Sequence, residues 1–108
     1  TAAYCAAKHG VVGLTRAVAL EAASKGVTVN AVCPGWVDTD MTRASIARIA
    51  NTTGRSEEQA RSALERMSPQ GRLIEPDEVA AVAMFLAGPD AHGINGQTLS
   101  VDGGELTA

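Results

Sequence analysis

The chain has 108 residues, of which 45% are hydrophobic and 19% are charged, and it carries a net charge of −3. This length allows one domain at most, and the slightly acidic balance excludes the basic surface that binds nucleic acid or an anionic membrane. The apolar runs are too short to cross a bilayer, and no signal peptide is recognisable. We therefore expect neither nucleic-acid nor membrane partners.

Residues 1–25 favour a long helix. The segment is rich in alanine and leucine, contains no proline and is followed by Gly26, a residue typical of helix ends. Because the segment is apolar on most sides, we expect one face to be buried against a sheet. Another face should pack against a second helix or a second subunit.

Tyr4 and Lys8 are one turn apart and therefore share a face of this helix. A neighbouring cation favours the phenolate and lowers the pKa of a tyrosine from about 10 toward the working range. Such a phenol can donate a proton to a carbonyl oxygen or accept one from an alcohol. The alternative is an accidental helical pair, with the tyrosine half-buried and the lysine extended toward solvent.

Residues 27–33 are β-branched and apolar on both alternating faces, except at Thr28 and Asn30. This pattern is typical of a strand buried on both sides of a parallel sheet, in which Asn30 fits a structural hydrogen-bonding role better than a catalytic one. Pro34 and Gly35 end the strand. Since ligands of open α/β sheets lie beyond the carboxyl ends of the strands, residues 34–42 are the predicted ligand-binding region.

Three residues of that region have suitable chemistry. Gly35 allows a close approach to a ligand, Val37 offers main-chain groups beside a flat ring, and the Thr39 hydroxyl can meet an amide or a phosphate. Thr39 or Asp40 can also cap the helix that follows, and this structural role is compatible with ligand binding.

Residues 41–67 predict two short amphipathic helices. The first covers about residues 41–51 and stops at a turn that contains Gly54, whereas the second opens with a capping box at residues 56–59. The predicted apolar face of the second helix comprises Ala60, Ala63, Leu64 and Met67.

Three arginines of this segment, Arg43, Arg48 and Arg55, have no acid among them. They indicate either a solvated basic patch or a contact with the phosphates of a CoA-type carrier.

Pro76 marks the first turn of a further helix that ends near Ala87, and residues 97–101 predict a second strand. Two buried strands that are joined through helices pair in parallel. His92, in the turn before the second strand, is typical of a solvated loop residue. The predicted core stripe of the helix comprises Val79, Val82, Ala83, Phe85 and Leu86.

Cys5 and Cys33 lie in apolar surroundings without the spacing of metal ligands. They predict free, buried thiols of a cytoplasmic protein rather than a disulfide framework.

Three blocks of sequence, in order along the chain, resemble the short-chain dehydrogenase/reductase family. They are YCAAKHGVVGLT at residues 4–15, VNAVCPGWVDT at residues 29–39 and GQTLSVDGG at residues 96–104. The resemblance implies an α/β fold, the C-terminal half of a doubly wound Rossmann-type parallel sheet. Residues 1–108 would belong to a single domain, with residues 41–67 as a helical lid over the substrate.

The resemblance also implies the roles of particular residues. Tyr4 would be the acid/base at the reacting oxygen, while Lys8 would lower the tyrosine pKa and hydrogen-bond the nicotinamide ribose. The cofactor would be NAD or NADP, without a metal. The family's glycine-rich dinucleotide turn and its catalytic serine and asparagine belong upstream of Tyr4, and they are absent from this chain. The implied cofactor contacts are Tyr4, Lys8, Pro34, Gly35, Val37 and Thr39.

The implied activity is an NAD(P)-dependent interconversion of a secondary alcohol and a ketone. The sequence is most similar to dehydrogenases of 3-hydroxybutyrate and 3-hydroxyacyl substrates, so a hydroxy or keto substrate, free or CoA-linked, is expected. The alternatives are a 3-oxoacyl-carrier-protein or polyketide ketoreductase and a catalytically silent member that acts as a binding or scaffold protein. A homotetramer or homodimer is the expected assembly.

Overall fold

The computed structural model describes residues 1–107, except for the side chain of Thr107, and the chain forms two compact units. The first unit consists of Thr1–Cys33 and Ala81–Leu99. The second consists of Pro34–Ala80 and Ser100–Ala108, although the structure does not describe the last residue, Ala108.

The first unit begins with the predicted helix. Helix α1 covers Ala2–Ala22 and continues into a 3-10 turn at Ala23–Lys25. Gly26 ends it in the left-handed conformation (φ 73°), which confirms the predicted stop. The expected burial of two faces is not observed within residues 1–107. Only Thr15 and Ala19 are buried, and Leu20 is 82% exposed, because no second layer covers the helix there.

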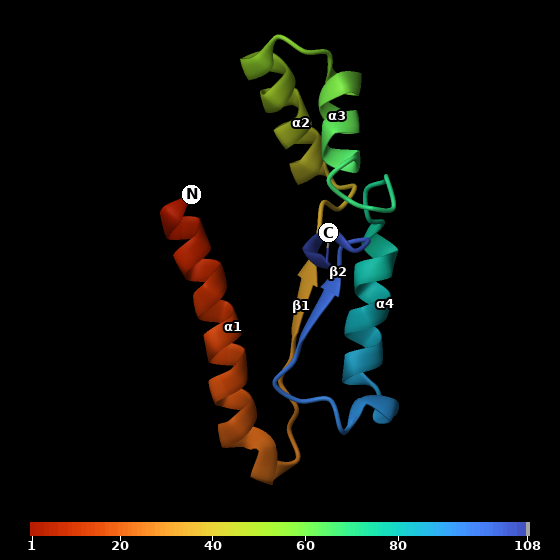
Figure 1. Ribbon diagram of the computed structural model, residues 1–108. Helices are drawn as coiled ribbons and strands as arrows, with labels where there is room; N and C mark the ends of the chain where they lie inside the picture. Colours follow the sequence, from red (N-terminus) through yellow and green to blue (C-terminus); the bar gives the residue numbers. More distant parts are fainter. Residues whose placement is uncertain (108) are drawn as a thin grey trace. The chain divides into compact units, whose positions relative to one another are not determined.

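Strands β1 (Ala31–Pro34) and β2 (Thr98–Val101) form a two-stranded sheet and run in the same direction (Figure 1). The Ala31 N–H donates to the Gln97 carbonyl (2.8 Å) and the Gly35 N–H to the Val101 carbonyl (3.0 Å). Both bonds fit a parallel register, which confirms the predicted pairing. However, β1 is half-buried rather than buried on both faces.

The segment before β1 differs from the prediction, because the strand begins at Ala31 and not at Val27. Side-chain amides take the backbone groups that a ladder would use. The Val29 N–H donates to Asn95 Oδ1 (2.9 Å), and Asn30 Nδ2 donates to the Ile94 carbonyl (2.9 Å) while its Oδ1 accepts from the Gln97 N–H (3.0 Å). Asn30 is therefore a structural hydrogen-bonding residue, as predicted.

The second unit contains a pair of helices that lie side by side, α2 (Asp40–Thr53) and α3 (Glu57–Glu65) (Figure 1). Gly54 ends α2 with φ 70°, two residues later than predicted, and the Ser56–Gln59 capping box is formed as predicted. Met67 is exposed and lies outside α3, so its assignment to the apolar face is wrong. The core between these elements consists of Ile46, Ala50, Ala60, Leu64 and Leu73.

Helix α4 covers Pro76–Ala87, the predicted bounds, with Asp77 and Glu78 in its first turn. None of its residues is buried, so the predicted core stripe is wrong for the described part of the chain. The two cysteines are free thiols, Cys5 exposed and Cys33 half-buried. The burial predicted for Cys5, which lies on α1, is likewise not observed within residues 1–107.

Candidate functional site

The tyrosine–lysine pair stands on the first turns of α1. The spacing of four residues in an unbroken helix brings the two side chains together, and Lys8 Nζ lies 5.5 Å from the centroid of the Tyr4 ring. Tyr4 is 67% exposed, so its hydroxyl is open to a second molecule. The predicted shared face is confirmed.

The loop that contains Pro34, Gly35, Val37 and Thr39 belongs to the second unit, where a parallel bridge pairs Val37 with Ile74. The Ile74 N–H donates to the Trp36 carbonyl (2.8 Å), and the Asp38 N–H donates to the Ile74 carbonyl (2.8 Å). Because these neighbours face Ile74, the N–H and C=O of Val37 point to the opposite edge.

That free edge fits the amide of a nicotinamide. Within residues 1–107 the Val37 N–H has no hydrogen-bond partner, and the Val37 carbonyl accepts only a long bond from the Thr39 hydroxyl (3.4 Å). A donor and an acceptor on one edge match the acceptor and donor of a carboxamide. The residues present therefore fit the predicted cofactor.

Gly35 is needed for a close approach, and the structure shows what approaches it. A Cβ atom at this position would lie 3.0 Å from the Asp102 Cβ and 3.2 Å from Glu105 Oε2. The Asp102 carboxylate is buried and accepts from the N–H groups of Gly104 (2.9 Å) and Leu106 (3.2 Å). The C-terminal turn thus packs on the loop, a contact that sequence analysis did not predict.

Thr39 caps α2, which confirms its predicted structural role. Its Oγ1 accepts from the Thr42 N–H at 3.3 Å. The loop and the Tyr4–Lys8 pair belong to different units. Their union in one cofactor site stays a prediction.

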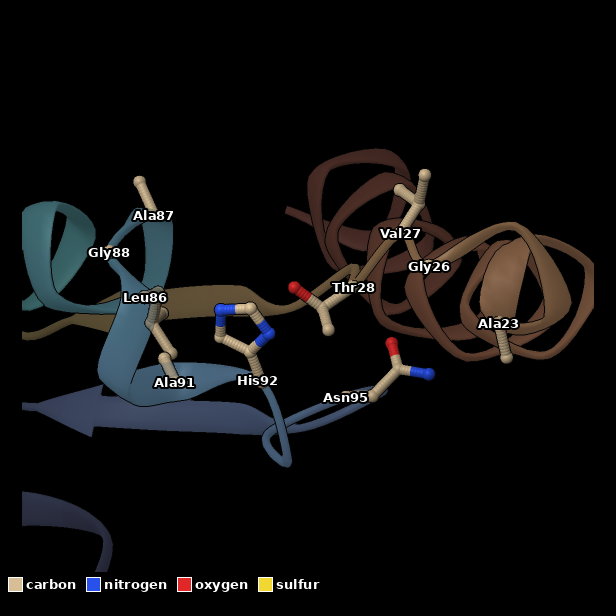
Figure 2. A pocket seen from close by; sticks show the side chains of 10 residues that line it. All are labelled: Ala23, Gly26, Val27, Thr28, Leu86, Ala87, Gly88, Ala91, His92 and Asn95. Carbon is tan, nitrogen blue, oxygen red and sulfur yellow. The ribbon is translucent and has the colours of Figure 1, made fainter.

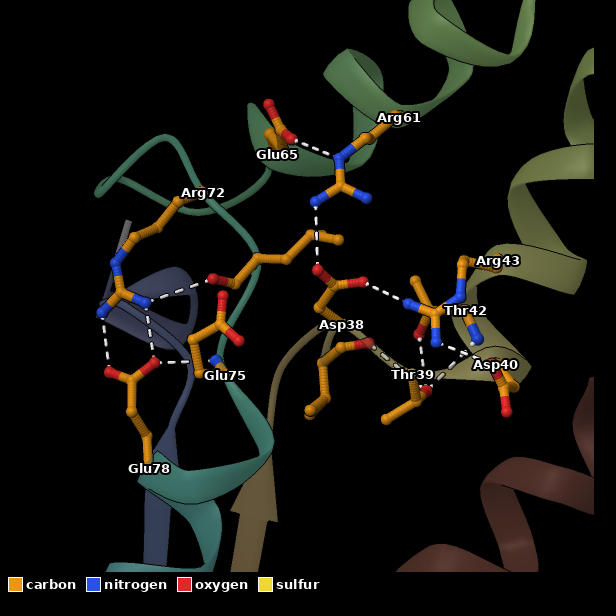
Figure 3. A network of polar contacts seen from close by, with 12 residues as sticks. Asp38, Thr39, Asp40, Thr42, Arg43, Arg61, Glu65, Arg72, Glu75 and Glu78 are labelled. Carbon is orange, nitrogen blue, oxygen red and sulfur yellow. Dashed lines mark hydrogen bonds and ion pairs between the residues drawn. The ribbon is translucent and has the colours of Figure 1, made fainter.

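An ion-pair network surrounds the loop, and its central residue, Asp38, was missed by sequence analysis (Figure 3). Arg43 pairs with Asp38 (2.8 Å) and Asp40 (2.6 Å), and Arg61 pairs with Glu65 (2.9 Å) and Asp38 (3.3 Å). The hydrogen bond with Asp40 raises the pKa of Arg43, and those with Asp38 and Glu65 raise the pKa of Arg61. The only sequence signal was the pair of acids just before the arginine-rich segment.

The network bears on whether Arg43, Arg48 and Arg55 form a solvated basic patch or contact the phosphates of a carrier. Arg43 is held by two carboxylates, and Arg48 donates to the Ser45 hydroxyl (3.3 Å). Arg55, in contrast, lines a shallow hollow of about 460 Å³ together with Glu58, Gln59, Ser62 and Arg66. Arg43 therefore is already paired with two acids of its own unit.

A second hollow, of about 500 Å³, lies in the first unit (Figure 2). Thr28, which precedes β1, and His92 and Asn95, which precede β2, contribute its polar side chains. It is therefore at the amino ends of the parallel strands, the end opposite to that where ligands of such sheets bind. His92 is exposed, as predicted.

Residues 1–107 contain neither a metal-binding cluster nor a membrane-spanning helix. No group of three or more histidine, cysteine, aspartate or glutamate side chains is placed to hold a metal ion. Among the helices described, none combines the length and the apolar character needed to cross a membrane.

The fold and site define a class, an α/β protein with parallel strands and a Tyr-x-x-x-Lys helix. The model of the enoyl-(acyl carrier protein) reductase family matches residues 1–105. The chain belongs to the short-chain dehydrogenase/reductase family, which confirms the resemblance and the α/β Rossmann-like fold.

Curated relatives and solved structures agree with this assignment. The chain is 47% identical to a D-beta-hydroxybutyrate dehydrogenase from Rhizobium meliloti (94% of this chain, 40% of the relative). It is 46% identical to an acetoacetyl-CoA reductase from the same organism (97% and 39%). The chain thus spans about two fifths of the length of the curated relatives it matches.

Two solved structures show the same fold. A short-chain dehydrogenase family protein from Francisella tularensis has a TM-score of 0.95 at 34% identity, over 98% of this chain and 44% of that one. An actinorhodin polyketide ketoreductase variant, solved with NADPH, has a TM-score of 0.89 at 44% identity, over 96% and 40%.

Proposed function

We propose that these residues form part of the active site of an NAD(P)-dependent oxidoreductase that interconverts a secondary alcohol and a ketone. The observation that carries the proposal is the exposed Tyr4 hydroxyl with the Lys8 ammonium over the same ring, 5.5 Å from its centroid. Relatives named for hydroxybutyrate and acetoacetyl-CoA support a 3-hydroxyacyl or 3-hydroxybutyrate-type substrate.

In the proposed reaction the nicotinamide, when bound, supplies or accepts the hydride at the carbonyl carbon. Tyr4 donates its phenolic proton to the carbonyl oxygen in the reductive direction and accepts the alcohol proton in the oxidative one. The Lys8 ammonium, on the same face of α1, donates a hydrogen bond to the ribose. The loop residues Pro34, Gly35 and Val37 contact the carboxamide of the nicotinamide. The Thr39 hydroxyl hydrogen-bonds either to this carboxamide or to a phosphate of the cofactor.

The alternative substrate class is a 3-oxoacyl or polyketide chain on a carrier protein, which the similarity to a polyketide ketoreductase supports. We also propose that the protein is cytoplasmic and that it forms a homotetramer or a homodimer. Residues 41–67 form its substrate lid. A catalytically silent scaffold is the remaining alternative, and it gives no reason for the exposed Tyr4–Lys8 pair.

The test is turnover by the full-length protein, followed through the absorbance of reduced nicotinamide. Acetoacetate, acetoacetyl-CoA and a carrier-linked 3-oxoacyl substrate are each assayed with NADH and with NADPH. Tyr4→Phe removes only the hydroxyl, and we expect the turnover number to fall about 100- to 10,000-fold. The melting temperature should not change, because the side chain is largely exposed. Unchanged turnover in Tyr4→Phe would show that the acid/base assignment is wrong.

A further inference from the structure

Asp38 lies in the middle of the loop that is proposed to bind the nicotinamide. Its carboxylate forms ion pairs with arginines of two helices, α2 and α3. Its Oδ1 accepts from Arg43 of α2 (2.8 Å), and its Oδ2 accepts from Arg61 of α3 (3.3 Å). In Figure 3 the carboxylate points between the two guanidinium groups. Arg61 is 23 residues away along the chain, so this contact is tertiary and not a consequence of helix formation.

Both ends of this connection are fixed. On the loop side, the Asp38 N–H is held by the Ile74 carbonyl (2.8 Å). On the helix side, α2 and α3 pack on one apolar core. Only Thr39 separates Asp38 from the first residue of α2, so the angle between loop and helix pair depends on few covalent bonds. The two ion pairs restrain that angle.

The charges also show what the network does not do. Three carboxylates, Asp38, Asp40 and Glu65, face two guanidinium groups, so no net positive charge is left for an anionic ligand. The side chains of Asp38, Arg43 and Arg61 are 24%, 55% and 41% exposed. Ion pairs this exposed add little to the free energy of unfolding, so the protein should stay folded when the Asp38 carboxylate is removed.

We propose that Asp38 is a positioning residue, which holds the α2–α3 pair at the angle that closes it over a substrate bound beside the nicotinamide. This inference rests on the proposed function, because the loop and lid roles come from it. Loss of the carboxylate charge frees the helix pair while the loop stays on Ile74. Substrate capture should then suffer more than the chemical step or cofactor binding.

The test compares Asp38→Asn with wild type in the full-length protein. We expect the KM for acetoacetyl-CoA to rise about fivefold or more, with kcat changed less than twofold. The Kd for NADPH, from nicotinamide fluorescence, should stay within about twofold. Added salt should raise the wild-type KM, because it screens half-exposed pairs, and should have less effect on the variant.

Two further variants separate this role from a general loss of stability. Glu78→Gln removes the Arg72–Glu78 pair, which has two bonds of 2.7 Å and comparable exposure but does not involve α2 or α3. It should leave KM unchanged. Arg61→Gln should raise KM, and the double variant with Asp38→Asn should be no worse than Asp38→Asn alone, as expected for two partners in one interaction.

Hydrogen exchange of the same proteins gives a readout that needs no turnover. Amides of α2 and α3 should exchange faster in Asp38→Asn than in wild type and should be unaffected by Glu78→Gln. If the wild type has no turnover, the proposed function fails and hydrogen exchange alone decides the role of Asp38. The inference would be overturned if the α2 and α3 amides of Asp38→Asn exchanged as slowly as those of wild type. It would also be overturned if Glu78→Gln raised the KM as much as Asp38→Asn does.

Discussion

At the scale of single residues, the proposed chemistry depends on the spacing of Tyr4 and Lys8 along the helix and on the exposure of the Tyr4 side chain. Tyr4 and Lys8 meet because four residues of α-helix return a side chain to the same face. Asp38, by contrast, gains its importance from Arg61 and Ile74, which are distant in sequence. A residue of the first kind is recognisable in a sequence, whereas one of the second kind is not.

Gly103 provides a test of backbone conformation at this scale. Its φ is 66°, and an added Cβ would overlap the hydroxyl of Ser68, which is buried and accepts from the Gln70 N–H (3.2 Å). Gly71 has nearly the same φ, 69°, with nothing near an added Cβ. Gly71→Ala should therefore destabilise the protein by about 1 kcal/mol, from the left-handed conformation alone.

Gly103→Ala should cost roughly 1 kcal/mol or more beyond that, because Ser68 must also move. Urea denaturation of both variants in the full-length protein measures the difference. Equal free energies of unfolding for the two variants would show that the Ser68 contact is not constraining.

At the scale of elements, the helices of the second unit are defined by their caps. Thr39 and Ser56 each accept a hydrogen bond from a first-turn N–H, at 3.3 Å and 3.1 Å. Such caps accept hydrogen bonds from N–H groups that have no partner within the helix, so each one adds about 1 kcal/mol to the free energy of unfolding.

The two caps allow structure and cofactor binding to be separated. Thr39→Ala and Ser56→Ala should each lower the free energy of unfolding by about 1 kcal/mol. Only Thr39→Ala should also weaken NADPH binding, because Ser56 lies outside the proposed cofactor loop. Fluorescence titration and urea denaturation on the same two variants check this. Equal NADPH affinity in both would remove Thr39 from the cofactor site.

The start of α4 carries a pH-dependent contact. The hydrogen bond from Arg72, together with the Glu75 N–H, lowers the pKa of Glu78 from 4.5 to about 2. In the unfolded chain this carboxyl binds its proton near pH 4.5, whereas the folded chain keeps it charged. Between about pH 4.5 and 2 the unfolded state therefore binds more protons, and stability falls as the pH is lowered.

Glu78→Gln should remove this contribution. The difference in urea midpoint between wild type and variant should be present at about pH 6 and should shrink as the pH falls toward 2. The effect should be small, because the pair is exposed to solvent. A difference that grows on acidification would contradict the assigned direction of the pKa shift.

At the scale of the whole molecule, apolar surface is the dominant feature of the described residues. Val11, Leu14 and Leu20 of α1 and Met84 and Phe85 of α4 are exposed large hydrophobic side chains. Water-exposed apolar area of this kind favours association.

We therefore predict that the 108-residue chain, expressed by itself, self-associates, whereas the full-length protein is a soluble oligomer. Light scattering coupled to size-exclusion chromatography measures both. Replacing Leu14 and Leu20 with glutamine in the short chain should reduce the association, because these two side chains lie on the exposed surface of α1. A monodisperse short chain that melts cooperatively would contradict this prediction.

Local sequence patterns were sufficient to predict α1 and its stop at Gly26, the capping box at Ser56, the bounds of α4 and the Tyr4–Lys8 spacing. Each of these depends on hydrogen bonds or contacts within a few residues. Only the tertiary structure shows the late start of β1, the bridge of Val37 to Ile74 and the bonding of Asp38 to both α2 and α3. These contacts join residues far apart in the chain, and their partners are selected by the packing of whole elements, which no local pattern encodes.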